Sequence, residues 1–144
     1  MKAVIQRVKR ASVTAGDRRA EIGPGLLVLA ALETEDSEDQ CRWAAAKIAT
    51  LRIFEDSQGR MNLGLGEVGG EILAVSQFTL AGSIAKGRRP SFDRAMAPVL
   101  ARPLFDFFVA CLRAEGCPVR TGFFQEEMDV ELVNAGPVTF ILER

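Results

Sequence analysis

The chain has 144 residues, of which 48% are apolar and 26% are charged, and its formal net charge is −1. A chain of this length and composition is typical of one soluble globular domain, which we place at residues 1–144. It contains no apolar run of about 18 residues, so no membrane span is expected. The near-neutral charge excludes a polycation, and any contact with nucleic acid would have to come from a local basic patch.

What the chain lacks limits its chemistry. It has no His, which excludes Ser-His-Asp and Cys-His catalysis and removes the commonest metal ligand. Its cysteines, Cys41, Cys111 and Cys117, form no Cys-x-x-Cys pair and argue against a zinc site. We interpret them as reduced thiols of a cytoplasmic protein, since charge interrupts the N-terminal segment too early for a secretory signal.

Hydrophobic periodicity predicts the elements in chain order. Residues 2 to 15 alternate like a strand, a turn and a short strand at 20–22 follow, and the apolar run 26–32 is typical of a strand buried on both faces. A capping box, Ser37-Glu38-Asp39-Gln40, opens a helix that extends to Leu51. Further strands are expected at 51–54, 61–63, 71–80, 118–121 and 128–142, with a second helix from Pro103 to Gly116. Two long helices among many strands predict an α+β fold with mixed, largely antiparallel sheets.

The stretch Ser76-Gln77-Phe78-Thr79-Leu80 closes a predicted strand with two hydroxyls, an amide and an aromatic ring. These groups suit a ligand site, although Thr and Phe are also ordinary strand residues. A nucleophilic Ser76 or Thr79 would need a base, and the chain has no His to serve as one.

The stretch Lys86-Gly87-Arg88-Arg89-Pro90 concentrates positive charge in a predicted loop. Arg and Lys in such a loop suit phosphate oxygens, and a solvated loop is the alternative interpretation. Arg7 would extend this patch if the first strand lies nearby.

The stretch Asn134-Ala135-Gly136-Pro137 interrupts two good strand segments. Gly permits backbone geometries closed to other residues, and Pro fixes φ and allows a cis bond. Such an element can present carbonyl oxygens to a ligand, and a kink in an edge strand is the alternative.

Taken with the N-terminal Met-Lys-Ala-Val-Ile-Gln-Arg-Val, the Ser-Gln-Phe-Thr-Leu and Asn-x-Gly-Pro-x-Thr motifs make the chain resemble D-aminoacyl-tRNA deacylases over nearly its whole length. The resemblance implies a homodimer with a layered β/β/α fold that hydrolyses the ester of D-aminoacyl-tRNA and of mischarged glycyl-tRNA. It further implies that the Gly-Pro bond is cis and that this motif enters the partner's pocket as a chiral filter. The terminal 2′-hydroxyl of tRNA then assists the attack, and no metal or organic cofactor is needed.

The resemblance also implies roles for single residues. The catalytic group is Ser76, Gln77, Phe78 and a supporting Thr79, with an oxyanion hole made by backbone N–H groups near Gln77 and Phe78. The remaining positions divide between the amino acid and the tRNA: Asn134, Gly136, Pro137 and Thr139 for the substrate, and Lys86, Arg88, Arg89 and Arg7 for the tRNA.

Three positions depart from the family pattern. Ser83-Ile84 stand where Asp-Thr is common, Gln125-Glu126 where Gly-Ala is common, and Ala135 where Asp is common. The second departure alters the shape and charge of the segment if it lines the pocket for the terminal adenosine.

Two other functions remain open from the sequence. One is a non-catalytic RNA-binding homodimer built on the Lys86–Arg89 loop. The other is a thiol-dependent enzyme using Cys111 or Cys117.

Overall fold

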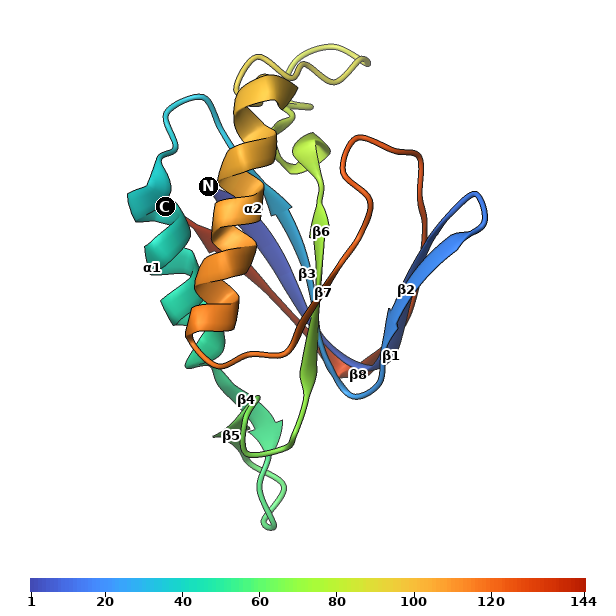
Figure 1. Ribbon diagram of the computed structural model, residues 1–144, viewed down its shortest axis with the longest axis vertical. Coiled ribbons are helices and arrows are strands. Elements are labelled where there is room, and N and C mark those ends of the chain that lie inside the picture. The colour runs from blue at the N-terminus through green and yellow to red at the C-terminus, as the bar shows by residue number, and fades with distance from the viewer.

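The structure is a computed structural model that describes residues 1–144, and it contains one curved sheet, two helices and a small hairpin (Figure 1). The strands are β1 (Lys2–Ala15), β2 (Arg18–Ile22), β3 (Gly25–Ala31), β4 (Arg52–Glu55), β5 (Met61–Gly64), β6 (Glu71–Ser76), β7 (Val119–Thr121) and β8 (Asp129–Glu143). The helices are α1 (Glu38–Ala49) and α2 (Pro98–Ala114), and a short 3₁₀ turn covers Phe78–Ala81.

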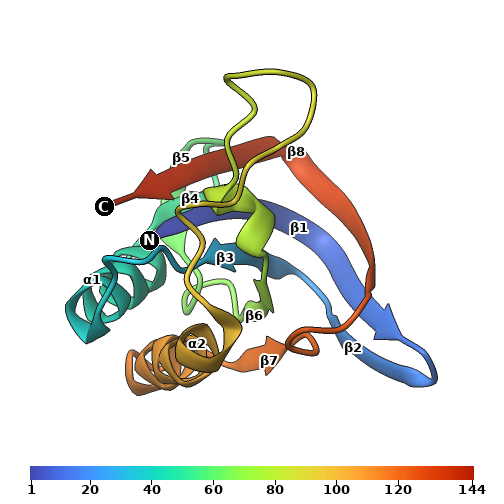
Figure 2. The ribbon, with the colours of Figure 1, turned by 90° about the horizontal axis from the view of Figure 1, so that it is seen from above.

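The main sheet has the order β2-β1-β3-β6-β7, and β8 pairs with the other edge of β1. β1 is antiparallel to β2, β3 and β8, whereas β3, β6 and β7 run parallel to one another. The predicted α+β class with mixed sheets is therefore confirmed. β1 reaches three partners because it is 14 residues long and bends (Figure 2). β8 pairs with both halves of β1, whereas β3 pairs with its first half and β2 with its second.

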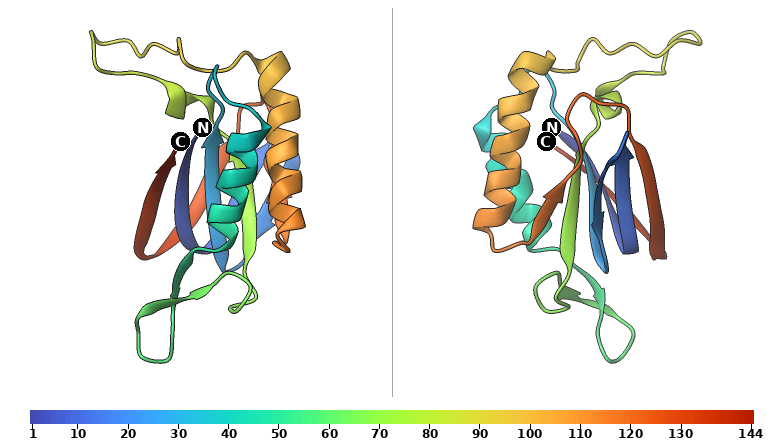
Figure 3. Two further views of the ribbon diagram at one scale, coloured as in Figure 1. Left: turned by 90° about the vertical axis from the view of Figure 1, so that its left-hand side faces the viewer. Right: turned by 45° about the vertical axis from the view of Figure 1, so that its right-hand side comes forward.

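The two helices cover one face of this sheet (Figures 2 and 3). Ile48 of α1 and Phe108 of α2 join Ile72 of β6 in the larger core, and all three are fully buried. Leu27 and Leu73 point the other way, into a second, smaller core beneath the β1–β2 hairpin. β3 is thus buried on both faces, as its uninterrupted apolar sequence predicts.

The capping box that predicts α1 is present, since Ser37 and Gln40 exchange the expected hydrogen bonds. The predicted start of the second helix at Pro103 is wrong. The helix begins at Pro98, which takes the first-turn position, and Pro103 lies inside it. Leu100, Ala101 and Arg102 extend the helix backwards because they are good helix formers.

The strand predicted at 71–80 ends earlier, at Ser76, and the chain turns into the 3₁₀ segment. Asn134–Pro137 does not end β8, which continues through it with register shifts opposite β1 between Gln6 and Arg10. The β4–β5 hairpin projects from the end of the molecule opposite the loop between the 3₁₀ segment and α2 (Figure 3). No helix combines the length and the apolar character needed to cross a membrane.

Candidate active site

A cavity of about 640 Å³ lies at the carboxyl end of β6. The predicted residues Ser76, Gln77 and Phe78 line it together with apolar side chains from the start of α2 and the segment before it. A further wall is formed by the loop that follows β7, including Gln125 and Glu126. The structure therefore brings three of the four predicted catalytic residues into one pocket, and of the three departures from the family pattern only Gln125-Glu126 lines it.

Thr79 lies behind Gln77 and does not line the cavity. The Nε2 of Gln77 donates to the Oγ1 of Thr79 at 2.5 Å, so the hydroxyl fixes the direction of the amide. This geometry suits a supporting part for Thr79.

Of two backbone N–H groups at the pocket, one is already hydrogen-bonded and the other is free. The N–H of Gln77 donates to the carbonyl of Ala30 at 2.8 Å, which extends the pairing of β3 with β6 by one residue. The N–H of Phe78 opens the 3₁₀ segment and has no acceptor within the chain. Phe78 thus offers, at the pocket, a main-chain donor that is free to bind a negatively charged oxygen.

The aromatic wall of the pocket is made by Phe78 and Phe92, whose ring centroids lie 5.2 Å apart. A Cβ at Gly82 would lie 2.8 Å from the Phe92 ring, so only glycine lets the loop pass this close. The Phe78 side chain is 56% exposed and is available to pack against a flat ligand.

The basic residues Lys86, Arg88 and Arg89 are exposed on the loop between the 3₁₀ segment and α2. Paired backbone hydrogen bonds of 2.8 and 2.9 Å between Ser83 and Ser91 close the base of this loop. Because Phe92 follows this loop directly and lines the pocket, the basic loop begins at the rim of the pocket. The loop projects beyond the N-terminal end of α2 (Figure 1).

The Asn134–Thr139 segment is held by its own side chains. Asn134 donates through Nδ2 to the Thr139 Oγ1 at 3.0 Å and accepts from the Val138 N–H at 2.7 Å through Oδ1. The Gly136–Pro137 peptide bond between them is cis, and Gly136 has a φ of +136°. Asn134 and Thr139 therefore hold the two ends of the Gly136–Pro137 turn together through hydrogen bonds.

Arg7 lies with this segment and does not extend the basic loop. Its side chain is 7% exposed, and its Nε donates to the Ala135 carbonyl at 2.9 Å. The same guanidinium donates to the Ile53 carbonyl at 2.7 Å and pairs with Glu55 at 3.1 Å. Its placement follows from the irregular pairing of β1 with β8, which leaves Arg7 without a β8 partner.

The Gly136–Pro137 turn and the Ser76–Phe78 pocket lie far apart in one chain. The strand register puts Arg7 beside Leu26 and Leu26 beside Ile72, at the start of β6, whereas the pocket lies at its end. The turn is therefore three strand spacings from β6 across the sheet, and the pocket lies several residues further along β6. Together these offsets place the turn about 20 Å from the pocket.

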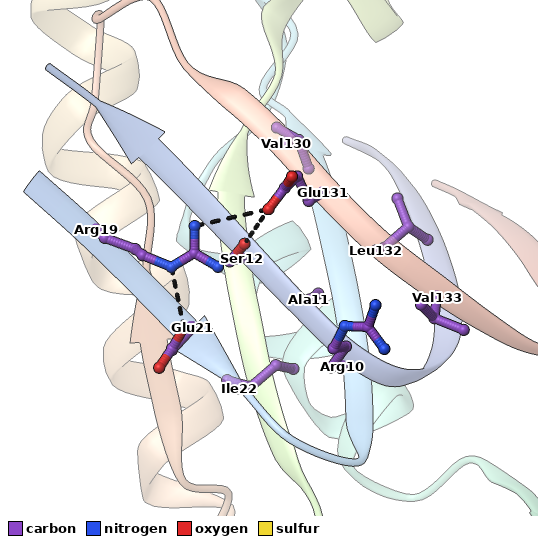
Figure 4. Close-up of a pocket in the computed structure, with 10 residues that line it drawn as sticks. All are labelled: Arg10, Ala11, Ser12, Arg19, Glu21, Ile22, Val130, Glu131, Leu132 and Val133. Atoms are coloured by element: carbon purple, nitrogen blue, oxygen red, sulfur yellow. Dashed lines mark hydrogen bonds and ion pairs between the residues drawn. The ribbon is translucent and has the colours of Figure 1, made fainter.

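A second hollow of about 480 Å³ lies between β1, β2 and β8 (Figure 4). One of its two arginines is paired: Arg19 pairs with Glu21 at 3.0 Å and with Glu131 at 3.6 Å. The hydrogen bond from Arg19 to Glu21 raises the pKa of the guanidinium above its already high value. Arg10 also lines the hollow, and no ion pair or hydrogen bond joins its side chain to another residue.

The thiols are unsuited to nucleophilic attack. Burial raises the pKa of Cys41 to about 12 and also raises the pKa values of Cys111 and Cys117. A protonated thiol is a poor nucleophile, so this argues against the thiol-dependent alternative. No group of three or more Cys, Asp or Glu side chains is arranged to hold a metal ion.

Comparison with known proteins agrees with the motifs at both segments. The family model described as D-Tyr-tRNA(Tyr) deacylase matches residues 4–143. The chain belongs to this deacylase family. The resemblance drawn from the two motifs is therefore confirmed.

Relatives of this deacylase family member cover its full length. A D-aminoacyl-tRNA deacylase of Pelobacter propionicus is 59% identical over 145 residues, covering 100% of both chains. One of Geobacter sulfurreducens is 57% identical and covers 99% of this chain and 95% of its own.

Two solved structures are also similar. "c-Myc DNA Unwinding Element Binding Protein" has a TM-score of 0.92 and 39% identity, covering 100% of this chain and 99% of its own. A probable eukaryotic D-amino acid tRNA deacylase has a TM-score of 0.83 at 20% identity over 98% of this chain and 97% of its own, and shows the common fold.

Sequence reasoning missed the apolar side of the pocket. Met96, Ala97 and Ala101 line it, but nothing in their spacing distinguishes them from the apolar surface of any helix and its approach. Phe92 follows Arg89-Pro90-Ser91 directly, and this proximity to the basic loop was the one available signal.

Proposed function

We propose that the protein hydrolyses the ester bond of D-aminoacyl-tRNA and of mischarged glycyl-tRNA, and so removes wrongly attached amino acids before translation. The observation that carries this proposal is the pocket at the end of β6, where Ser76, Gln77 and the free N–H of Phe78 converge. The chain's membership of the deacylase family supports it.

The proposed chemistry needs no acid–base side chain. A water oxygen attacks the ester carbonyl, assisted by the 2′-hydroxyl of the terminal ribose, and negative charge develops on the carbonyl oxygen. The Phe78 N–H is placed to stabilise that charge as an oxyanion donor, and Gln77, fixed by Thr79, helps orient the ester. The ester bond then breaks, and the 3′ oxygen leaves with a proton as the tRNA hydroxyl.

Discrimination against L-aminoacyl-tRNA is assigned to the Gly136–Pro137 turn. Rigid carbonyl groups bind the α-amino group and occupy the direction that an L side chain would take. A D side chain points elsewhere and glycine has none, so both are accepted. Overlap with a rigid backbone cannot relax cheaply, which makes steric exclusion strong. The bonds from Arg7 to Ala135 and within Asn134–Thr139 supply the rigidity.

The same proposal requires a homodimer. Because the Gly136–Pro137 turn lies about 20 Å from the pocket of its own chain, it acts in the pocket of a second copy. β8 carries exposed apolar side chains suited to an interface, namely Val130, Leu132, Phe140 and Ile141.

The basic loop is assigned to the tRNA backbone near the acceptor end. Lys86, Arg88 and Arg89 are exposed at the rim of the pocket and offer donors to phosphate oxygens. Such a protein acts in the cytoplasm, where aminoacyl-tRNA is used.

The test is hydrolysis of a matched pair of D- and L-aminoacyl-tRNAs that share one tRNA and one amino acid. We expect release of the D-amino acid while the L-ester survives. Equal hydrolysis of both esters, or of neither, would remove the proposal. The alternative, a non-catalytic RNA-binding homodimer, is favoured by the exposed basic loop. It would show salt-dependent binding of tRNA without turnover.

A further inference from the structure

The loop that follows β7 forms one wall of the pocket and places a negative charge there. Residues Gly122–Met128 form a loop whose Phe124, Gln125, Glu126 and Met128 line the cavity. Gln125 has a φ of +63°, a backbone conformation that residues other than glycine seldom adopt. The loop thus holds a carboxylate, that of Glu126, beside a pocket proposed to receive the end of a polyanion.

Glu126 is not alone at the wall. The guanidinium of Arg18, at the start of β2, forms an ion pair with its carboxylate. The same guanidinium lies over the ring of Phe123, with its Cζ 4.5 Å from the centroid. Arg18 therefore joins the β1–β2 hairpin to the pocket loop by a charge and by a stacking contact.

The pair is accessible to solvent, since the side chains of Arg18 and Glu126 are 52% and 41% exposed. An exposed pair of this kind adds little to folding stability. The pair can still affect the binding of an anion, because it sets the net charge of the pocket wall. With the partner present the wall is locally neutral, and without it one negative charge faces the cavity.

The other charges of the adjoining hollow do not replace Arg18. Arg18, Glu126, Arg102 and Asp106 share a small hollow of about 200 Å³ behind the loop. Arg102 lies over the ring of Phe124, at 5.5 Å from the centroid, and Asp106 is negative in its own right. The four charges cancel, and removal of Arg18 leaves the set negative.

We propose that Arg18 is a charge-compensating residue of the substrate site, which neutralises Glu126 and so permits the tRNA end to enter this pocket. The inference rests on the proposed function and specifies which residues of this chain set the affinity for the anionic substrate. Arg18 acts through Glu126 and does not contact the reacting ester.

The experiment compares Arg18→Ala, Glu126→Gln and the double variant in steady-state hydrolysis of D-aminoacyl-tRNA. Arg18→Ala is expected to raise KM about fivefold at low salt with kcat unchanged, as one uncompensated charge near a phosphate predicts. The increase is expected to shrink at high salt. Glu126→Gln alone is expected to lower KM at low salt, because Arg18 is then an uncompensated positive charge, and the double variant is expected to recover the wild-type KM.

A matched control is Arg42→Ala. Arg42 also combines an ion pair, to Glu38 at 2.6 Å, with a position over an aromatic ring, that of Phe107 at 4.8 Å, but it lies on α1. Its loss is expected to leave KM unchanged.

A purely structural role would give a different pattern. If Arg18 served only to hold the loop, Glu126→Gln would raise KM as Arg18→Ala does, and the double variant would not recover. That pattern, or a fall in kcat alone, would overturn the proposal. The affinity for tRNA that carries no amino acid is measured on the same variants. Absence of hydrolysis by the wild-type protein would therefore refute the activity, and the charge comparison would still be decided by binding.

Discussion

Substitution of Gly136 by Ala tests the main-chain filter most directly. A Cβ at this position would lie 2.7 Å from the Cγ2 of Val138 and 3.0 Å from an Nη atom of Arg7. It would also lie 3.1 Å from the Val138 N, which is backbone and cannot move freely. The methyl group is thus expected to displace the turn and the guanidinium that holds it.

The backbone conformation adds to this steric cost. A φ of +136° is essentially restricted to glycine, and a residue forced to hold it costs about 1–3 kcal/mol. For a domain of this size, that range lowers the melting temperature by roughly 2–12 °C. Movement of the turn by even about 1 Å is expected to lower kcat/KM for the D-ester on the order of 100-fold.

The assay is thermal unfolding together with hydrolysis of the matched D- and L-aminoacyl-tRNA pair. Gly59→Ala is the control, since Gly59 also has a positive φ, of +73°, but has no atom near its added Cβ. Gly59 lies in the turn between β4 and β5, and its variant is expected to lose some stability and keep full selectivity. A Gly136→Ala protein with wild-type kcat/KM and wild-type D/L selectivity would refute the reasoning. So would a larger loss of activity from Thr79→Ala, whose hydroxyl only supports Gln77.

Three further outcomes are expected. Arg7→Ala leaves the Ala135 and Ile53 carbonyls without their donor and should lower the free energy of unfolding by about 1–3 kcal/mol for each, measured by urea denaturation, with D/L selectivity reduced. Arg88→Ala should raise KM and reduce the salt dependence of tRNA binding by about one phosphate contact, measured by filter binding, whereas an unchanged salt slope would contradict a phosphate contact. The Cys41 pKa is raised from its usual 9.0 to about 12 by burial, so the protonated thiol stabilises the fold fully below pH 9 and this contribution is lost as the pH rises toward 12. Urea titrations at pH 8 and at about pH 10.5 should therefore show a loss of stability that Cys41→Ala lacks, and an equal loss in that variant would exclude the thiol as its cause.

Local signals predicted much of the fold. The capping box at Ser37 and the apolar run of β3 are complete within a few residues, so the sequence alone identifies α1 and a strand buried on both faces. The start of α2 was misplaced because Pro98 and Pro103 both satisfy the first-turn pattern, and only packing decides between them. Boundaries of this kind depend on tertiary contacts that no local window contains.

The candidate site was predictable in its motifs and not in its arrangement. Ser76–Phe78 could be selected because polar groups cluster at a strand end, and they line one cavity. The position of Arg7 could not, since it follows from irregular pairing between strands more than a hundred residues apart in sequence. The division of backbone donors between Gln77 and Phe78 likewise depends on where β6 stops pairing with β3.

The distance between the Gly136–Pro137 turn and the Ser76–Phe78 pocket has a genetic consequence. In the proposed dimer each catalytic centre combines a turn from one copy with a pocket from the other. Two inactive proteins, one altered only at Gly136 and one only at Gln77, would then restore each other when their subunits are exchanged. If the two proteins are mixed in equal amounts and exchange subunits at random, about a quarter of all catalytic centres would be intact.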